Sequence, residues 1–220
     1  MKLLPNLFTL ANAAVGCWTL YFISVIDFES ATHCVLICCV FDFFDGFLAR
    51  VLGATSEFGK QLDSLADVIS FGVVPGAVAA VMLGVLDADF PWFFIGFIIT
   101  LASVYRLANY NTSDQNKAHF SGLPTPANAL FWIGLTHIET EIGFNFIVGA
   151  VIVTSFLLNS SLVFYRIQLK YSLRSVAKVL LMIVLMIALW VQFSHLAFSI
   201  AITVYFLFSL IYSLVAKSKE

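Results

Sequence analysis

Four aspartates stand close together in the sequence as two pairs, and each pair has helical spacing. Asp42 and Asp45 are three residues apart, and Asp63 and Asp67 are four residues apart. Residues at these spacings share one face of an α-helix. Clustered carboxylate oxygens are the ligands that Mg²⁺ and Mn²⁺ prefer. We therefore predict that the four aspartates hold Mg²⁺ or Mn²⁺, with two ions about 3.5–4 Å apart as in sites for phosphoryl displacement.

The surroundings of the first pair distinguish it from acids that simply face water at a helix end. Four phenylalanines surround Asp42 and Asp45, and an aspartate at the centre of a membrane helix is unfavourable by about 2.5–3.5 kcal/mol on insertion scales. Arg50 is the nearby cation expected on the same face. Acids at a helix N-terminus are favourable, which would explain Asp63 and Asp67 without a metal. It does not explain the first pair.

The composition indicates which elements position these aspartates. Hydrophobic residues make up 61% of the 220-residue chain and charged residues 11%, against roughly 45–50% and 25% in soluble domains. This balance excludes a soluble enzyme, a disordered chain and a basic nucleic-acid-binding protein, so no nucleic-acid partner is expected. We predict an all-α integral membrane protein, a polytopic helical bundle that forms a single membrane domain over residues 1–220.

Apolar stretches predict about eight transmembrane helices, because about 20 apolar residues cross a bilayer core. The predicted spans are residues 7–26, 31–51, 66–86, 91–110, 126–138, 143–164, 177–193 and 196–216. Longer polar stretches separate some of them at residues 52–65, 111–125 and 165–176. Asp63 and Asp67 are expected at the start of the third helix.

The distribution of charge predicts the orientation. With the N-terminus inside, all 11 Lys and Arg residues lie on the inner side, and the outer loops contain only acids, such as Asp27, Asp87 and Glu139. Lys and Arg are retained on the cytoplasmic side during insertion. We therefore expect a multi-pass protein of the cell (inner) membrane with both termini cytoplasmic and the aspartate site facing the cytoplasm.

The cysteines and histidines predict no further site. The four cysteines lie in apolar runs without zinc or disulfide spacing: Cys17, Cys34, Cys38 and Cys39. Three histidines are expected near the outer side and one in an inner loop: His33, His137 and His195, and His119. The histidines are interpreted as too scattered to form a site.

The aspartates and the residues between them resemble the signature of the CDP-alcohol phosphotransferase family. The matching residues 42–67 read Asp42-x2-Asp45-Gly46-x2-Ala49-Arg50-x8-Gly59-x3-Asp63-x3-Asp67. The resemblance implies a membrane enzyme, usually a homodimer, that transfers a substituted phosphoryl group from a CDP-linked donor to an alcohol and releases CMP. It also implies that all four aspartates bind metal and that Asp67 is the general base. The residues implied at the CDP-diacylglycerol site are Pro5, Asn6, Gly46, Arg50 and Gly59.

Four further blocks resemble the bacterial and archaeal phosphatidylserine synthases within that family. They cover residues 5–12, 63–72, 106–111 and 122–126. The resemblance implies CDP-diacylglycerol and L-serine as substrates, an enzyme surrounded by membrane lipids, and an acceptor-side loop at residues 106–126. The candidate serine-binding residues there are Arg106, Asn109, Asn111 and Lys117.

Three alternatives stay open at this point. Another acceptor of the same family, glycerol 3-phosphate or inositol phosphate, would require a denser group of cations than Arg106 and Lys117. An ion-coupled transporter also uses intramembrane acids, but typically near the midplane and within inverted repeats. A prenyltransferase has aspartate-rich metal motifs but lacks the glycine and arginine spacing found here.

Overall fold

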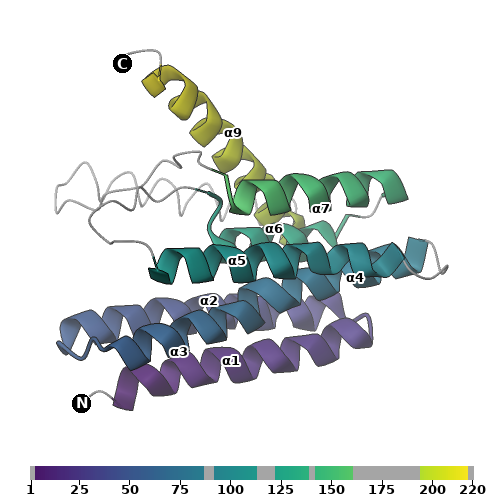
Figure 1. The fold of residues 1–220 in the computed structure, drawn as a ribbon. Helices are drawn as coiled ribbons and strands as arrows, with labels where there is room; N and C mark the ends of the chain where they lie inside the picture. Colours follow the sequence, from purple (N-terminus) through teal and green to yellow (C-terminus); the bar gives the residue numbers. More distant parts are fainter. Residues whose placement is uncertain (1–2, 87–91, 113–121, 139–141, 161–193, 218–220) are drawn as a thin grey trace.

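A computed structural model describes residues 3–86, 92–112, 122–138, 142–160 and 194–217 of the chain. Within these residues every regular element is a helix, which confirms the all-α prediction (Figure 1). The helices are α1 (Leu3–Ser24), α2 (Phe28–Val51), α3 (Glu57–Asp67), α4 (Val74–Leu86), α5 (Ile98–Thr112), α6 (Thr125–Leu135), α7 (Phe144–Leu158) and α9 (Ala197–Lys217). Shorter elements are the π-helical turn η1 (Val68–Val73) and the 3₁₀ helices η2 (Trp92–Phe97) and η3 (Ser194–Leu196).

Several of the described helices are long and apolar enough to cross a membrane. Leu3–Ser24, the continuous run Glu57–Leu86 and Trp92–Thr112 meet both conditions, and Phe144–Leu158 and Ala197–Ser209 are shorter apolar helices. The chain is a helical membrane protein. The predicted span 177–193 lies outside the described residues, so the number of eight spans stays a prediction.

The helix that carries the second aspartate pair begins at Glu57, and the predicted start at residue 66 is wrong. The Ser56 side chain accepts a hydrogen bond from the backbone N–H of Gly59 at 3.0 Å, as an N-cap residue does. Residues 57–63 are mostly polar, so the search for apolar stretches did not include them. As a result, Asp63 and Asp67 lie well inside the helical run, and the connection from α2 covers only residues 52–56.

A π-helical turn follows Asp67 directly. Turns of this kind are rare and frequently lie at functional sites. The Thr100 hydroxyl donates a hydrogen bond to the carbonyl of Gly72 at 3.0 Å, and the Ser70 hydroxyl donates one to the carbonyl of Asn12 at 3.1 Å. These contacts from α5 and to α1 hold the wide turn in place just after the aspartates.

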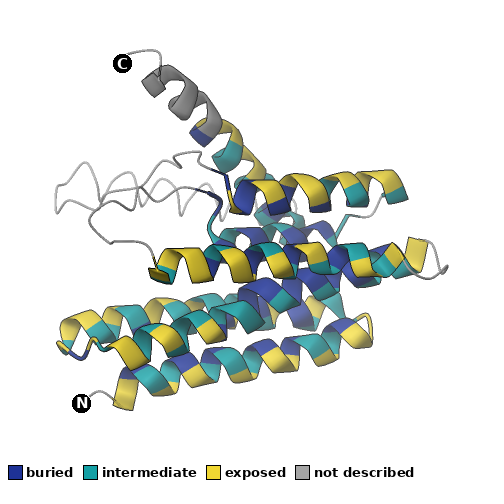
Figure 2. Cartoon of the chain, in the orientation of Figure 1, coloured by how far each residue is buried: buried dark blue, intermediate teal, exposed yellow. Residues whose placement is uncertain are grey.

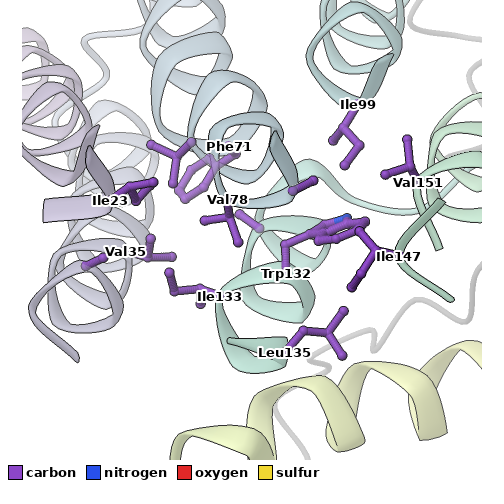
Figure 3. Close-up of a cluster of buried hydrophobic side chains, with 14 of the residues drawn as sticks. Ile23, Val35, Phe71, Val78, Ile99, Trp132, Ile133, Leu135, Ile147 and Val151 are labelled. Carbon is purple, nitrogen blue, oxygen red and sulfur yellow. The ribbon is translucent and has the colours of Figure 1, made fainter. Parts of the chain in front are cut away.

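The hydrophobic core surrounds η1 and α4 (Figure 3). Phe71 and Val78 are fully buried and pack with residues of α5, α6 and α7, including Trp132. The indole N–H of Trp132 donates to the hydroxyl of Thr154 on α7 at 3.2 Å. Exposed apolar side chains lie on the outward faces of the bundle (Figure 2), as expected for helices in contact with lipid.

One end of the bundle collects the elements that carry the aspartates. The start of α1, the end of α2, the start of α3 and the end of α5 lie together on the left of Figure 1. The connection between α1 and α2 lies at the opposite end. The charge distribution predicts that the first of these ends, the inner end, is cytoplasmic.

Single cysteines in a cysteine-free background test this orientation. Cysteine at Glu57, which is exposed near the start of α3, should resist a membrane-impermeant thiol reagent in intact cells. Cysteine at Glu29, exposed in the first turn of α2, should react. Both sites should react after the cells are opened, which controls for accessibility. Labelling at position 57 in intact cells would show that the predicted orientation is wrong.

Candidate functional site

Three of the four aspartates converge at the inner end of the bundle. Carboxylate oxygens of Asp42 on α2 and of Asp63 and Asp67 on α3 all lie within 4.8 Å of one another. All three side chains are half-buried. We refer to Asp42, Asp63 and Asp67 as the three-aspartate cluster.

The three-aspartate cluster has the chemistry of a site for a divalent cation. The Oδ1 atoms of Asp63 and Asp67 are buried and accept no hydrogen bond from the described residues. Like charges brought together away from water repel one another and are costly unless a cation compensates them. Because every donor atom is a carboxylate oxygen, the residues fit Mg²⁺ or Mn²⁺.

Asp45 differs from the other three aspartates in its surroundings. It is 4% exposed, and its Oδ2 atom accepts a hydrogen bond from the hydroxyl of Thr9 on α1 at 2.7 Å. It still lies close enough to Asp63 for electrostatic interaction. The structure therefore places Asp45 beside the three-aspartate cluster and ties it to α1. Thr9 was missed as a site residue, although it lies within the sequence block 5–12.

A cavity of about 560 Å³ opens between α1, α2 and α3 and reaches the aspartates. It is lined by all five residues predicted for the CDP-diacylglycerol site: Pro5, Asn6, Gly46, Arg50 and Gly59. Asp45 and Asp63 form part of its wall, and Lys60 lines it as a second cation besides Arg50. Sequence reasoning missed Lys60 because residues 52–65 were interpreted as a loop. The cavity thus has two cationic side chains and two of the four aspartates in its wall.

The two signature glycines have different structural roles. A Cβ atom on Gly59 would lie 3.3 Å from Asn6 Oδ1 and 3.2 Å from Ser56 Oγ, so this glycine allows α3 to approach α1 closely. A Cβ atom on Gly46 would make only an ordinary 3.5 Å contact with the Arg50 guanidinium. Packing within the protein therefore does not require glycine at position 46. The space beside Arg50 that a larger side chain would occupy is part of the cavity.

The candidate acceptor residues lie on α5, on another side of Asp67. Arg106 is half-buried and interacts electrostatically with Asp67. The Asn111 amide donates a hydrogen bond to the hydroxyl of Ser64 on α3 at 2.8 Å. Asn109 is exposed, and Lys117 lies outside the described residues. The structure therefore brings Arg106 and Asn111 against the helix that carries Asp63 and Asp67.

Comparison with known proteins agrees with this arrangement. A sequence model described as CDP-alcohol phosphatidyltransferase matches residues 2–159, which include all four aspartates and α5. The chain belongs to the CDP-alcohol phosphatidyltransferase family. The match covers the whole cavity and the three-aspartate cluster, so both lie in the part of the chain that the family shares.

Several curated relatives of this CDP-alcohol phosphatidyltransferase family member carry names that include serine. The chain is 33% identical over 132 residues to the CDP-diacylglycerol–serine O-phosphatidyltransferase of Helicobacter pylori, covering 59% of this chain and 55% of the relative. It is 33% identical over 173 residues to the archaetidylserine synthase of Methanothermobacter thermautotrophicus, covering 75% and 70%. The protein from Bacillus subtilis with the same name as the Helicobacter enzyme is 32% identical over 131 residues, covering 57% and 71%. The chain thus matches about half the length of the Helicobacter relative.

Proposed function

We propose that the protein transfers the phosphatidyl group of CDP-diacylglycerol to the hydroxyl group of L-serine, giving phosphatidylserine and CMP. The observation that carries this proposal is the convergence of the three-aspartate cluster beside a cavity that contains Arg50 and Lys60. Family membership favours group transfer over an ion-coupled transporter, and the names of the relatives favour serine.

The cavity suits the head of the lipid donor. Its volume lies within the roughly 300–1,000 Å³ of typical small-molecule pockets. The guanidinium of Arg50 and the ammonium of Lys60 would form charge-assisted hydrogen bonds with the diphosphate. Pro5, Asn6, Gly46 and Gly59 would line the cytidine portion, while the acyl chains stay in the lipid next to the bundle.

The aspartates would hold two divalent ions, Mg²⁺ or Mn²⁺. Asp42, Asp63 and Asp67 are the proposed ligands, together with Asp45 from its position at the cavity wall. When bound, the ions would neutralise the diphosphate and polarise the phosphorus that is attacked. The hydrogen bond from Thr9 holds the Asp45 carboxylate in one orientation and thereby limits where its oxygens could contact an ion.

Asp67 is the proposed general base. Its carboxylate would accept the proton of the serine hydroxyl as the serine oxygen forms a bond to the phosphorus that carries the diacylglycerol. The bond from that phosphorus to the bridging oxygen of the diphosphate breaks, and CMP leaves with this oxygen. A positioned base typically contributes about 10²–10⁴-fold to the rate.

Arg106 is the proposed partner of the serine carboxylate. The planar guanidinium binds a carboxylate through two parallel hydrogen bonds, and Arg106 lies next to the proposed base. Asn111 and, from the same stretch of sequence, Asn109 and Lys117 are further candidates around serine. Arg106 is the only Lys or Arg in α5, which favours a carboxylate over the phosphate group of glycerol 3-phosphate or inositol phosphate.

We further propose that the enzyme works as a homodimer in the cell membrane with the site facing the cytoplasm. Serine and CMP are water-soluble cytosolic compounds, and the charge distribution favours an orientation with the inner end of the bundle on that side. Exposed apolar side chains on the described helices supply faces for lipid or for a second copy.

A panel of acceptors tests the proposed function. Purified protein with CDP-diacylglycerol and Mn²⁺ should release CMP when L-serine is added, and a radiolabelled serine should appear in the lipid product. Glycerol 3-phosphate and inositol phosphate should give little CMP. If glycerol 3-phosphate is used faster than serine, the assignment of the acceptor is wrong while the family reaction stands.

Replacing Arg106 and Arg50 separately should affect the two substrates differently. Arg106→Ala should raise the KM for serine far more than the KM for CDP-diacylglycerol, because a lost binding contact appears in the KM of the substrate it holds. Arg50→Ala, its matched control, should show the opposite preference. The measurement is initial rates of CMP release with each substrate varied in turn. An equal effect of Arg106→Ala on both KM values would contradict the assignment.

Thr9→Val should lower kcat/KM by roughly 10- to 100-fold, since a hydrogen bond to a charged group contributes about 1.5–3 kcal/mol. The change removes the hydroxyl that orients Asp45 and leaves the volume of the side chain nearly unchanged. Thr19→Val is the matched control, because the buried Thr19 hydroxyl on the same helix donates to the backbone carbonyl of Val15 at 2.8 Å and not to an aspartate. Equal losses in both variants would mean that Thr9 acts through helix stability alone.

A further inference from the structure

Three histidines meet at the outer end of the bundle, opposite the aspartates. His33 lies on α2, His137 follows the end of α6, and His195 lies in η3. The ring of His195 is 5.4 Å from that of His33 and 4.6 Å from that of His137, measured between ring centres. The structure thus places these three histidines next to one another, whereas they were expected from the sequence to be scattered. Helix α6 packs against both α2 and α9, and this packing unites residues that are far apart in the sequence.

Hydrogen bonds assign the proton on two of these rings. His33 Nδ1 lies 2.9 Å from the backbone carbonyl of Glu29, which can only accept, so Nδ1 donates and Nε2 keeps a lone pair. The hydroxyl of Thr32 donates to the carbonyl of Phe28 at 2.7 Å. It can therefore accept from His137 Nε2, 2.8 Å away, which leaves the lone pair of His137 on Nδ1.

This is the arrangement that supports histidine ligands in metal sites. A ligating histidine almost always donates its second ring N–H to a backbone carbonyl, a carboxylate or another oxygen, which fixes the ring and its tautomer. Both His33 and His137 meet this condition. Burial lowers the pKa of His195 and the neighbouring His33 lowers it further, while the Glu29 carboxylate raises it.

We propose that His33, His137 and His195 bind a transition-metal ion such as Zn²⁺ at the outer end of the bundle. With Zn–N bonds of about 2.0–2.1 Å, two imidazoles on one tetrahedral ion have ring centres roughly 5 Å apart. The two measured separations agree with this value. Metal binding would draw the ring nitrogens toward one ion by small movements that keep the hydrogen bonds of His33 and His137. Glu29, one turn before His33, or a water molecule would complete a four-coordinate site.

The proposed site differs from the three-aspartate cluster in ligand type and in effect. Imidazole nitrogens suit zinc, copper and nickel, whereas carboxylate oxygens suit magnesium and manganese. An ion held by these histidines would connect α2, α6 and η3, and through η3 the start of α9. We therefore expect it to stabilise the packing of α9 on the bundle rather than to take part in group transfer.

Zinc binding to the purified protein tests the proposal. The protein, without a histidine tag and with excess Mg²⁺ to occupy the aspartates, should bind one Zn²⁺ per chain and unfold at a higher temperature. The double variant His33→Gln/His195→Gln should lose both effects. Thr32→Val should weaken binding by roughly 10–100-fold, as expected when a supporting partner of a ligand is lost.

Matched variants distinguish this site from other binding. His119→Gln changes the fourth histidine of the chain, and Thr19→Val removes a buried hydroxyl elsewhere; both should bind Zn²⁺ as the unchanged protein does. Asp63→Asn should also keep the site. Circular dichroism and the elution volume without Zn²⁺ establish that each variant is folded. The proposal is wrong if the folded double histidine variant retains the bound Zn²⁺, or if Asp63→Asn removes it.

Discussion

Asp67→Asn should reduce the rate of CMP release by about 10²–10⁴-fold, the usual contribution of a positioned general base. Asparagine keeps the size of the side chain and one ligating oxygen but cannot accept the proton of the serine hydroxyl. Binding of CDP-diacylglycerol should therefore still depend on the divalent metal. Single-turnover rates and binding of the lipid donor, each measured with and without Mn²⁺, separate the two effects.

The surroundings of Asp67 make this expectation specific. Asp67 belongs to the proposed metal site and also interacts electrostatically with Arg106, the proposed partner of serine. A variant that retains normal turnover and an unchanged pH profile would show that the proton goes to another group. A variant that loses donor binding as well would show that Asp67 acts mainly as a ligand.

Asp63→Asn should weaken metal activation and turnover together. Loss of a residue that only hydrogen-bonds a metal ligand lowers metal affinity or activity by roughly 10–100-fold. Replacing a carboxylate that itself binds the ion should lower both by more. The buried Asp63 Oδ1, which accepts no hydrogen bond from the described residues, is the atom that a metal would compensate. The measurement is the Mn²⁺ concentration that gives half-maximal CMP release, and Asp42→Asn should behave in the same way.

Asp27→Asn is the control for this pair of variants. Asp27 caps α2 by accepting a hydrogen bond from the backbone N–H of Ser30 at 3.0 Å, and asparagine caps a helix about equally well. It lies at the opposite end of α2 from Asp42, so its replacement should leave the metal requirement unchanged. Unaltered metal activation in Asp63→Asn would contradict the role assigned to the three-aspartate cluster.

The sequence predicts the parts of this site that depend on local spacing. Helical periodicity places Asp63 and Asp67 on one face of α3, and the apolar composition predicts the helices that carry them. The start of α3 was predicted wrongly because a capped, polar first turn has no hydropathy signal. The signature glycines and Arg50 were found through the resemblance, and in the structure they line one cavity.

Contacts between helices could not be derived in the same way. Asp42 and Asp45 share a helical face in the sequence, but the hydroxyl of Thr9, 36 residues away, bonds to only one of them. The hydrogen bond between Thr32 and His137 joins residues 105 positions apart. Such contacts depend on which helices pack together and at what depth, and neither spacing nor hydropathy contains that information.

The most direct test of the central claim is the metal dependence of CMP release from CDP-diacylglycerol and L-serine. Protein stripped of divalent ions with a chelator should release no CMP, and Mg²⁺ or Mn²⁺ should restore release in the unchanged protein but not in Asp63→Asn. Serine-dependent CMP release that continues without divalent ions would contradict the role of the aspartates. The absence of CMP with every acceptor and either metal would contradict the proposed transfer reaction itself.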